Sequence, residues 1–315
     1  MSQPRSTICL RAFCITFVII CCTMVNMVHS REFYDLTPVK LGCEVRGIDI
    51  GNHLAEEVIE QIKKDVTEHR LLIFKDQHNI SPNRHVGIGR WFGDLESSFF
   101  TQHPKSPLRD VYRVSNDDSE GLRAVGTGAW HSDCLYLPNL CSYSIFHVIN
   151  VSKEAETDFV PLNEIVEGLS ESQLSKWEKL WLVVIRKEVR VDHPLIYSHP
   201  ESNKKVLSLP TGFVKAFAWD TGDGTKFLSD REGSTEIRNE ILSVLKRRLE
   251  DLKYPHMWEV GDFIIADNQA VAHWAPPSSQ KPRTEVGLRV LHRVTVAGKE
   301  APERKYDSFK EKDEL

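Results

Sequence analysis

Trp130-His131-Ser132-Asp133 is the stretch that decides the fold, because it places an imidazole and a carboxylate two residues apart. The surrounding sequence is typical of a β-strand, on which alternate side chains point to the same face. His131 and Asp133 would then converge on one point. With one more imidazole they would form the two-histidine, one-carboxylate face of a non-haem iron site. Alone, the triplet fits two ordinary polar residues equally well.

His273 can supply the missing imidazole. It follows Trp258–Asn268, a segment that predicts a turn, a buried strand and a second turn. His273 is distant from Asp133 along the chain, but a sheet that folds on itself can bring their strands together. We therefore predict that His131, Asp133 and His273 meet in one metal site.

Two arginines lie four residues apart on the next predicted strand, Leu288–Val296. At this spacing Arg289 and Arg293 share one face of an otherwise apolar strand. Buried arginines are rare unless they are paired. The pattern therefore predicts a bound anion, and a planar guanidinium suits a carboxylate best.

The composition is that of an ordinary globular protein. The chain has 315 residues, of which 41% are hydrophobic and 27% charged, and this predicts one domain with a sizeable core. The formal net charge is −5, and no basic run carries interleaved aromatic residues. Nucleic acid is therefore not an expected partner.

Residues 1–30 predict a cleaved secretory signal. Arg5 and Arg11 precede an uncharged apolar run that begins at Ala12, and Val28-His29-Ser30 offers residues that a signal peptidase reads. The alternative is an uncleaved signal anchor, and the chain would contact a membrane only in that case.

The last four residues, Lys312-Asp313-Glu314-Leu315, form the tetrapeptide that an ER-retention receptor reads. They end a charged tail, residues 299–315. Together with the N-terminal segment, this tail predicts that the domain lies in the lumen of the endoplasmic reticulum. Asn79 and Asn150 would then be glycosylation acceptors, with Asn79, in a turn-like loop, the better candidate.

Three cysteines follow the predicted signal: Cys43, Cys134 and Cys141. Cys134 and Cys141 flank a turn and could form a disulfide in an oxidising compartment. We expect buried thiols instead, because the chain is not a small cysteine-dense scaffold.

Hydrophobic periodicity predicts a mixture of helices and short strands. Helices are expected over Ala55–His69, Ser81–Gly93, Ser170–Leu182 and Ser234–Leu252. Strands are expected as a pair around Val39–Ile50 and at Leu71–Phe74, Val111–Ser115 and Ser142–Val151. A glycine-rich loop, Gly121 to Gly128, leads into the strand that carries His131.

Further signatures surround the two histidines and the carboxylate, in a fixed order along the chain. They are Gly47-Ile48-Asp49, Phe74-Lys75-Asp76-Gln77, Phe92-Gly93-Asp94-Leu95, His193-Pro194 with His199-Pro200, Trp258–Asp262, Asp267-Asn268 and Leu291–Gly298. With these residues the chain resembles the taurine/2,4-dichlorophenoxyacetate dioxygenase family of Fe(II)- and 2-oxoglutarate-dependent enzymes, from about Val39 to Gly298.

The resemblance implies a mainly β fold with flanking helices, the double-stranded β-helix or jelly roll, over residues 31–298. It implies that His131, Asp133 and His273 are the catalytic residues that hold Fe(II). Arg289 would bind the distal carboxylate of 2-oxoglutarate, helped by the hydroxyl of Thr157. The family's usual glycine pair before this threonine is replaced here by Ala155-Glu156, and Arg283 in a nearby loop is the rival of Arg289.

The resemblance also implies that Arg293 binds the substrate, with His103 as its partner. The alternative for His103 is a solvated loop histidine. The implied reaction uses O2, converts 2-oxoglutarate to succinate and CO2, and hydroxylates a small organic acid, either a sulfonate or a carboxylate. Two alternatives remain: a non-catalytic luminal protein that binds small acids and retains the jelly roll, and a structural protein of the endoplasmic reticulum.

Overall fold

The structure, a computed structural model, describes residues 29–30, 33–98, 101–210 and 212–304. The C-terminal tetrapeptide and all but the last two residues of the predicted signal lie outside these ranges. Within them, no helix combines the length and the apolar character needed to cross a membrane.

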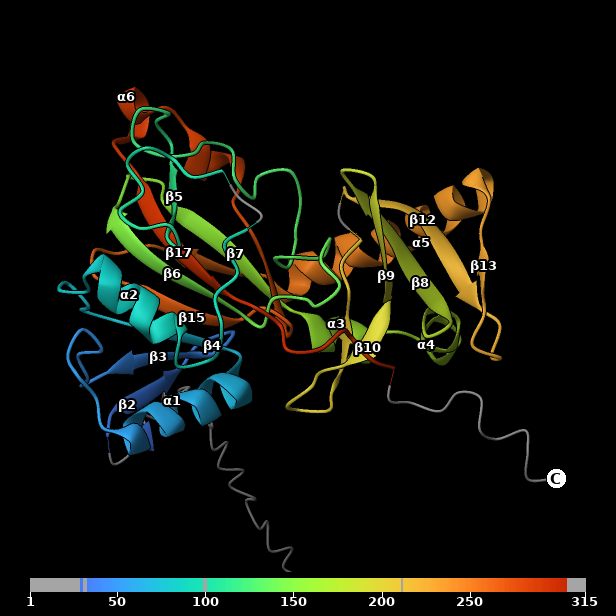
Figure 1. Cartoon of the computed structure of the whole chain (residues 1–315), viewed down its shortest axis with the longest axis horizontal. Helices are drawn as coiled ribbons and strands as arrows, with labels where there is room; N and C mark the ends of the chain where they lie inside the picture. The colour runs from blue at the N-terminus through green and yellow to red at the C-terminus, as the bar shows by residue number, and fades with distance from the viewer. Residues whose placement is uncertain (1–28, 31–32, 99–100, 211, 305–315) are drawn as a thin grey trace, which may run out of the picture.

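The largest sheet has the strand order β1-β2-β3-β4-β15-β6-β17-β5 (Figure 1). Its neighbouring strands are antiparallel except β3 and β4, which run parallel. The strands are β1 (His29–Ser30), β2 (Asp35–Pro38), β3 (Cys43–Arg46), β4 (Leu71–Phe74), β5 (Tyr112–Ser115), β6 (Tyr143–Asn150), β15 (Phe263–Asp267) and β17 (Val290–Val296).

A smaller antiparallel sheet packs on one face of the largest sheet. It consists of β14 (Tyr254–Met257), β7 (Glu156–Pro161) and β16 (Val271–Trp274). Phe146 of β6, Ile264 of β15 and Phe159 of β7 belong to one buried cluster between the two sheets. This face-to-face pair of sheets has the layered arrangement of a jelly roll.

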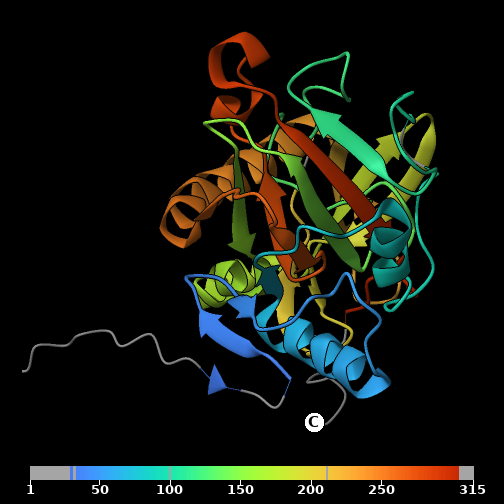
Figure 2. The ribbon, with the colours of Figure 1, turned by 90° about the vertical axis from the view of Figure 1, so that its left-hand side faces the viewer.

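Two helices cover the other face of the largest sheet (Figure 2). Helix α1 (Glu56–His69) buries Ile59, Ile62 and Val66 on one stripe, as its periodicity predicts. In α2 (Pro82–Gly89), Ser81 caps the first turn by accepting a hydrogen bond from the backbone of Arg84. These helices cover the face of the largest sheet that points away from the smaller sheet.

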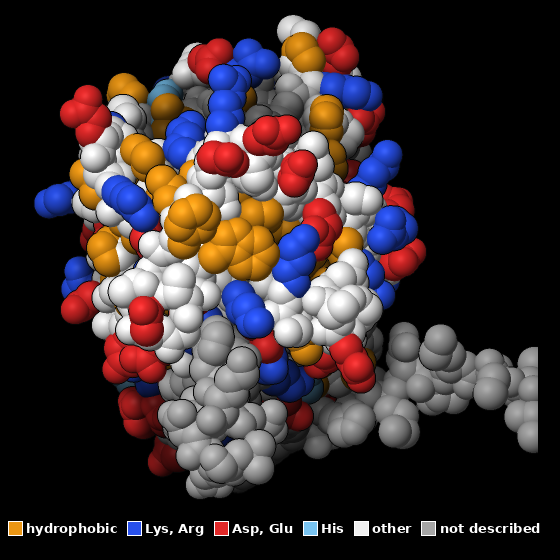
Figure 3. Space-filling view, turned by 90° about the vertical axis from the view of Figure 1, so that its right-hand side faces the viewer, with side chains coloured by type: hydrophobic (Ala, Val, Ile, Leu, Met, Phe, Trp, Pro, Cys, Tyr) orange, Lys and Arg blue, Asp and Glu red, His pale blue; other side chains and the backbone are white. Residues whose placement is uncertain are grey.

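The segment between β7 and β14 forms a second group of elements, at the right of Figure 1. Its sheet has the order β13-β12-β8-β9, and β10 and β11 form a separate pair. The bounds are β8 (Leu180–Arg186), β9 (Val189–Pro194), β10 (Ile196–Ser198), β11 (Lys205–Leu207), β12 (Val214–Asp220) and β13 (Lys226–Leu228). On this side apolar side chains gather among charged ones (Figure 3), and β9 and β13 carry the exposed Val189, Phe227 and Leu228.

The long helix α5 (Arg231–Leu252) packs on this second sheet through Ile241 and Leu245, which share a buried cluster with Leu182 and Phe217. The remaining helical elements are short: α3 (Leu162–Glu167), α4 (Glu171–Trp177), α6 (Arg283–Val286) and the 3-10 helix η1 (Pro277–Gln280).

Two predicted boundaries in the N-terminal third are wrong. The first strand pair is β2 and β3, so it begins before Val39, and the residues after Pro38 form the connecting turn. Gly42 closes that turn at φ 82°, where a Cβ would lie 2.0 Å from the carbonyl oxygen of Leu71. The second helix ends at Gly89 rather than Gly93, and Gly89 packs against Val294 of β17, where a Cβ would lie 2.8 Å from a methyl carbon.

The predicted helix Ser170–Leu182 is also wrong at its end. Ser170 caps α4 as expected, but the helix stops at Trp177, and β8 begins at Leu180. The run that follows contains Val183, Val184 and Ile185, whose branched side chains favour a strand. It pairs with β9 and β12 and buries Leu182 and Val184.

Candidate functional site

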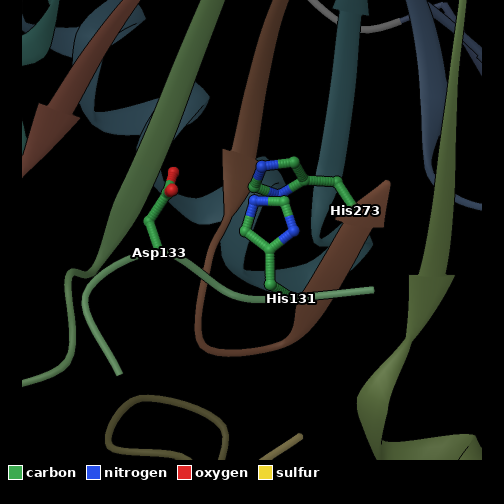
Figure 4. Close-up of side chains that lie close together, drawn as sticks. All are labelled: His131, Asp133 and His273. Atoms are coloured by element: carbon green, nitrogen blue, oxygen red, sulfur yellow. The ribbon is translucent and has the colours of Figure 1, made fainter. Parts of the chain in front are cut away.

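His131, Asp133 and His273 offer ligand atoms that all lie within 4.8 Å of one another. Figure 4 shows the two imidazole rings beside each other and the carboxylate to one side of them. The structure therefore brings together the three residues that the sequence predicts as metal ligands. Two imidazoles and one carboxylate suit Fe(II) in an open site.

The two histidines are positioned by the backbone. The N–H of His131 donates to the carbonyl oxygen of His273 at 3.0 Å, and the N–H of His273 donates to that of His131 at 2.9 Å. Residues that exchange both bonds are directly opposite in an antiparallel pair, so their side chains lie on one face. The ring centroids are 4.4 Å apart as a result.

The predicted strand at His131–Asp133 is wrong beyond His131. His131 forms an isolated bridge, and the chain then turns at Asp133 and Cys134, which has φ 71°. Asn268 clamps this turn: its Oδ1 accepts from the backbone N–H of Asp133 at 2.7 Å. Its Nδ2 donates to the carbonyl oxygens of Asp133 at 3.1 Å and of Cys141 at 2.7 Å. A clamped turn, rather than the pleat of a strand, aims the carboxylate.

Cys134 and Cys141 form a disulfide, so the expectation that they are thiols is wrong. Asn268 donates to the backbone at both ends of the loop between the two cysteines. The Cα atoms of the cysteines lie 5.5 Å apart, a usual separation for a disulfide. Cys43 is a buried thiol, as expected.

Asp133 is ionised. Its Oδ1 accepts from Nη1 of Arg293 at 2.8 Å, and its Oδ2 accepts from the hydroxyl of Ser144 at 2.5 Å. Burial alone would raise the pKa of Asp133, but the charge of Arg293 and the nearby imidazoles lower it to about 2. An ionised carboxylate has about four lone-pair directions, so these two bonds leave room for a metal.

Both histidines are neutral, the state in which imidazole binds metal. Burial lowers the pKa of His131, and burial together with the neighbouring His131 lowers that of His273 to about 3. Nδ1 of His131 lies 3.0 Å from the carbonyl oxygen of Ala129. With its proton assigned there, Nε2 of His131 is the ligand atom.

The glycine-rich loop reaches this site through Gly126, which sequence analysis did not single out. Gly126 has φ 71°, and a Cβ there would lie 2.9 Å from Cε1 of His131. Its carbonyl oxygen accepts from the backbone of Ala275, two residues after His273. The loop therefore packs directly on the ring of a candidate ligand, which only a residue without a side chain allows.

Arg289 lies in the interior with 2% of its surface exposed. Within the described ranges, its Nε and Nη1 have no hydrogen-bond partner, although its backbone is held by Asn116 and Ser115. Burial lowers its pKa to about 10, so it stays charged at neutral pH. A buried cation with unsatisfied donors is costly without an anion. Its rival Arg283 is half exposed and forms an ion pair with Asp117 at 3.3 Å.

Thr157 is buried on β7, where its hydroxyl oxygen accepts from Nε1 of Trp258 at 2.9 Å. The hydroxyl can still donate its own proton. Within the part of the chain that the structure describes, no hydrogen bond joins Thr157 to Arg289, so their shared role stays a prediction.

The two residues predicted to bind substrate differ in their surroundings. Arg293 is buried, pairs with Asp133 and lies over the ring of Tyr112 at 5.0 Å. His103 is exposed, with Nε2 3.1 Å from the carbonyl oxygen of Asp118 and Nδ1 accepting from the backbone of Lys105. Both of its ring nitrogens thus form contacts within a surface loop. These contacts of His103 do not involve Arg293.

A cavity of about 860 Å³ lies elsewhere, between α1 and residues 299–303. It is lined by Tyr197, His199 and Asp267 among others, and none of the predicted site residues lines it. His199 and Asp267 already form a buried ion pair at 3.0 Å. We therefore place the site by its donor atoms rather than by cavity size.

Comparisons with known proteins show which family the chain resembles. Residues 32–295 match the family model described as taurine catabolism dioxygenase TauD, TfdA family. An alpha-ketoglutarate-dependent sulfate ester dioxygenase of Pseudomonas putida is 23% identical, over 86% of this chain and 91% of its own. An alpha-ketoglutarate-dependent 2,4-dichlorophenoxyacetate dioxygenase of Cupriavidus pinatubonensis is 24% identical, over 73% of this chain and 86% of its own.

The solved structure of a taurine dioxygenase from Burkholderia xenovorans has a TM-score of 0.68 to this chain. The two are 24% identical, and the match covers 84% of this chain and 91% of that structure. The predicted jelly roll is thereby confirmed.

Proposed function

This chain belongs to the TauD/TfdA family and is a 2-oxoglutarate-dependent dioxygenase that uses Fe(II), and we propose that it hydroxylates a small organic acid. Its cosubstrates are 2-oxoglutarate and O2. One oxygen atom enters 2-oxoglutarate, which leaves as succinate and CO2, and the other enters a substrate C–H bond to give an alcohol.

In this proposal His131, Asp133 and His273 hold the iron. The fit rests on the donor set: two neutral imidazoles and one ionised carboxylate within 4.8 Å of one another. Bound Fe(II) would supply the activation of O2 that couples loss of CO2 to oxidation of the substrate. Asn268 and Ser144 keep the carboxylate oriented, and Ala129 fixes the tautomer of His131.

Arg289 would bind the distal carboxylate of 2-oxoglutarate, with Thr157 as a second donor. The two nitrogens of Arg289 that lack partners within the described ranges support this assignment. A planar guanidinium can form two parallel bonds to a carboxylate. The same group would orient the cosubstrate.

The proposal of an acidic substrate rests on Arg293. Its buried guanidinium, the second one in the segment that also contains Arg289, is bonded to Asp133 itself. This places a cation beside the metal ligands, where it would attract an anion. Relatives named for sulfate esters and for 2,4-dichlorophenoxyacetate also act on acids. A sulfonate, a sulfate ester and a carboxylate all fit this chemistry.

The test is iron-dependent succinate formation by the purified protein, with acids and their neutral analogues as candidate substrates. We expect acids to stimulate succinate release and neutral analogues to leave it at the uncoupled rate. Binding of an acid without any succinate in the presence of Fe(II), 2-oxoglutarate and O2 would favour the alternative, a binding protein that retains the jelly roll.

We also propose the lumen of the endoplasmic reticulum as the location. The Cys134–Cys141 disulfide supports an oxidising compartment. Asn79 and Asn150 are both exposed, as glycosylation requires. A shift in mass on treatment of the cell-derived protein with an endoglycosidase is expected, whereas an unglycosylated, fully reduced protein would contradict this location.

A further inference from the structure

A buried hydrogen bond links Trp258 to Thr157. The indole Nε1 of Trp258 donates to the hydroxyl oxygen of Thr157 at 2.9 Å, and the two residues are only 3% and 4% exposed. An indole N–H can donate a hydrogen bond but cannot accept one, so the hydroxyl oxygen must be the acceptor. The proton of the hydroxyl therefore points away from the indole, toward another group.

Trp258 also holds the segment where this chain departs from the family pattern. Ala155-Glu156 stands where the family usually has a glycine pair, directly before Thr157. The backbone N–H of Trp258 donates to the carbonyl oxygen of Ala155 at 2.9 Å, and both residues belong to one buried cluster. Met257 pairs with Glu156 in the sheet. The replaced pair is thus fixed against β14, and Thr157 follows it at the position that the indole contacts.

A second set of contacts holds the indole ring itself. His256 lies directly opposite Thr157 in the pairing of β14 with β7, and its ring meets that of Trp258 edge to face, with centroids 4.9 Å apart. Nε2 of His256 lies 3.0 Å from Oδ2 of Asp262. The carboxylate of Asp262 is buried and forms an ion pair with Lys75 at 2.5 Å. A ring supported by packing and by buried polar contacts keeps one orientation.

The buried cluster that contains Trp258 extends to the segment that carries Arg289. Val114 of β5 and Leu291 of β17 belong to the same cluster. Leu291 follows Arg289 by two residues. Ser115, next to Val114, donates its hydroxyl to the carbonyl oxygen of Arg289 at 2.7 Å. The cluster therefore spans the space between the two sheets, from Trp258 to the backbone at Arg289.

The donors at the two ends of this space are suited to a carboxylate. Arg289 provides Nε and Nη1, which have no hydrogen-bond partner within the described ranges. Thr157 provides the proton that points away from Trp258. A carboxylate has only acceptors and about four lone-pair directions, enough for all three donors. A hydroxyl that already accepts one hydrogen bond also donates the next one more strongly.

We propose that Trp258 is a positioning residue for the cosubstrate: its indole N–H orients the hydroxyl of Thr157 as a donor to the distal carboxylate of 2-oxoglutarate. Thr157 and Arg289 contact the cosubstrate, and Trp258 acts through Thr157. This inference rests on the proposed function, because it takes from there the binding of that carboxylate by Thr157 and Arg289.

The experiment combines Trp258→Phe, which keeps an aromatic ring but removes the N–H, with Thr157→Val, which keeps the shape but removes the hydroxyl. Trp177→Phe is the matched control, because Trp177 is fully buried and its Nε1 donates to Glu240 at 3.0 Å. The probes are 2-oxoglutarate and 2-oxopentanoate, which has a methyl group in place of the distal carboxylate. Anaerobic calorimetry of the Fe(II)-loaded proteins gives the Kd of each probe.

Trp258→Phe is expected to raise the Kd of 2-oxoglutarate by about fivefold or more, and Thr157→Val by about tenfold. Neither variant should change the Kd of 2-oxopentanoate or of Fe(II), since neither ligand uses the hydroxyl of Thr157. Trp177→Phe should change none of these values. The double variant should bind 2-oxoglutarate as Thr157→Val does, because Trp258 acts through the hydroxyl.

Three results would overturn the role of Trp258. The first is an unchanged Kd of 2-oxoglutarate in Trp258→Phe while Thr157→Val and Arg289→Leu raise it, which leaves the proposed function standing. The second is equal weakening of both probes by Trp258→Phe, the sign of a merely structural role. The third is an added loss in the double variant. An unchanged Kd in Trp258→Phe, Thr157→Val and Arg289→Leu alike would overturn the proposed cosubstrate site as well.

If Trp258→Phe does not fold, fluorine NMR of the Zn(II)-loaded wild type labelled with 5-fluorotryptophan decides. Thr157→Val identifies the resonance of Trp258, because it removes the partner of that indole N–H. We expect 2-oxoglutarate to shift this resonance and 2-oxopentanoate to leave it in place. A resonance that responds equally to both probes, or to neither, would overturn the proposal.

Discussion

His131 and His273 lie directly opposite each other and exchange both backbone hydrogen bonds, at 3.0 and 2.9 Å. Their imidazoles are held on one face by main-chain geometry, before any side-chain contact contributes. Two segments far apart in sequence are thereby fixed at the spacing a metal needs. The third ligand, Asp133, depends instead on a turn clamped by Asn268 and on its bond to Arg293.

The first prediction concerns the glycine that covers His131. Gly126→Ala should displace the imidazole, because the added Cβ would lie 2.9 Å from Cε1 and the backbone has φ 71°. We expect weaker Fe(II) binding in an anaerobic titration. Gly128→Ala is the control, since nothing lies within 4 Å of its Cβ position. Equal loss of iron in both variants would argue against specific packing on His131.

The second prediction concerns the clamp on the carboxylate. Asn268→Ala removes hydrogen bonds to the backbone of Asp133 and Cys141 and leaves those groups buried. We expect a loss of unfolding free energy on the order of 2–4 kcal/mol in urea, with weaker Fe(II) binding. Asn52→Ala, which removes an exposed bond to Asp49, should cost far less. A stable Asn268→Ala protein with wild-type iron affinity would show that the clamp is dispensable.

The third prediction concerns the cosubstrate. Arg289→Leu should weaken 2-oxoglutarate binding by on the order of 2–5 kcal/mol, because the distal carboxylate would lose a buried charged partner. Arg283→Leu should have little effect, since that side chain is half exposed and pairs with Asp117. Affinities from calorimetry of the Fe(II)-loaded protein provide the ranking. The reverse order would transfer the role to Arg283.

The fourth prediction is that the metal-depleted protein loses stability as the pH falls from about 6.5 to 4. Among the described residues six histidines have a lowered pKa in the fold: His85, His131, His147, His193, His273 and His292. Burial is the first cause for each, and it brings His147 to about 4 and His292 to about 3. In this window the unfolded chain therefore binds more protons than the folded one. Acid then favours unfolding, by about 1.4 kcal/mol per pH unit for each proton.

Two groups oppose this trend. The pKa of His199 is raised: burial lowers it, but the charge of Asp267 more than offsets this. Burial raises that of Asp158 to about 6. Each stabilises the fold at low pH, but the six histidines outnumber them. Urea unfolding at pH 7.5, 6 and 5 measures the net change in the free energy of unfolding. Stability that stays constant or rises on acidification would contradict the burial of these imidazoles.

Hydrophobic periodicity correctly predicted elements that bury one stripe or a short apolar run against a sheet. Leu71–Phe74 is a strand with the predicted bounds because four apolar residues cross a sheet covered on both faces, and the stripe of α1 holds for the same reason. The strand predicted for His131–Asp133 failed because a disulfide and the side chain of Asn268, remote in sequence, bend the chain there.

The same limit explains why sequence analysis missed β8. The predicted helix extended to Leu182, so Leu180–Arg186 was not recognised as a strand. Its partners in the sheet, β9 and β12, follow it along the chain. Likewise, Arg293 lies in β17 whereas Arg289 precedes it, and a register irregularity at Val290 and Leu291 separates them. The bond of Arg293 to Asp133 depends on the turn at Asp133, which their spacing in sequence does not predict.

The most direct test of the central claim is anaerobic titration of the metal-depleted protein with Fe(II), compared with His131→Ala, Asp133→Ala and His273→Ala. We predict that wild type binds one iron per chain, that each variant loses this binding while keeping its fold by circular dichroism, and that succinate release is lost in parallel. Stoichiometric iron binding by folded Asp133→Ala and His273→Ala proteins would contradict the assignment of the site.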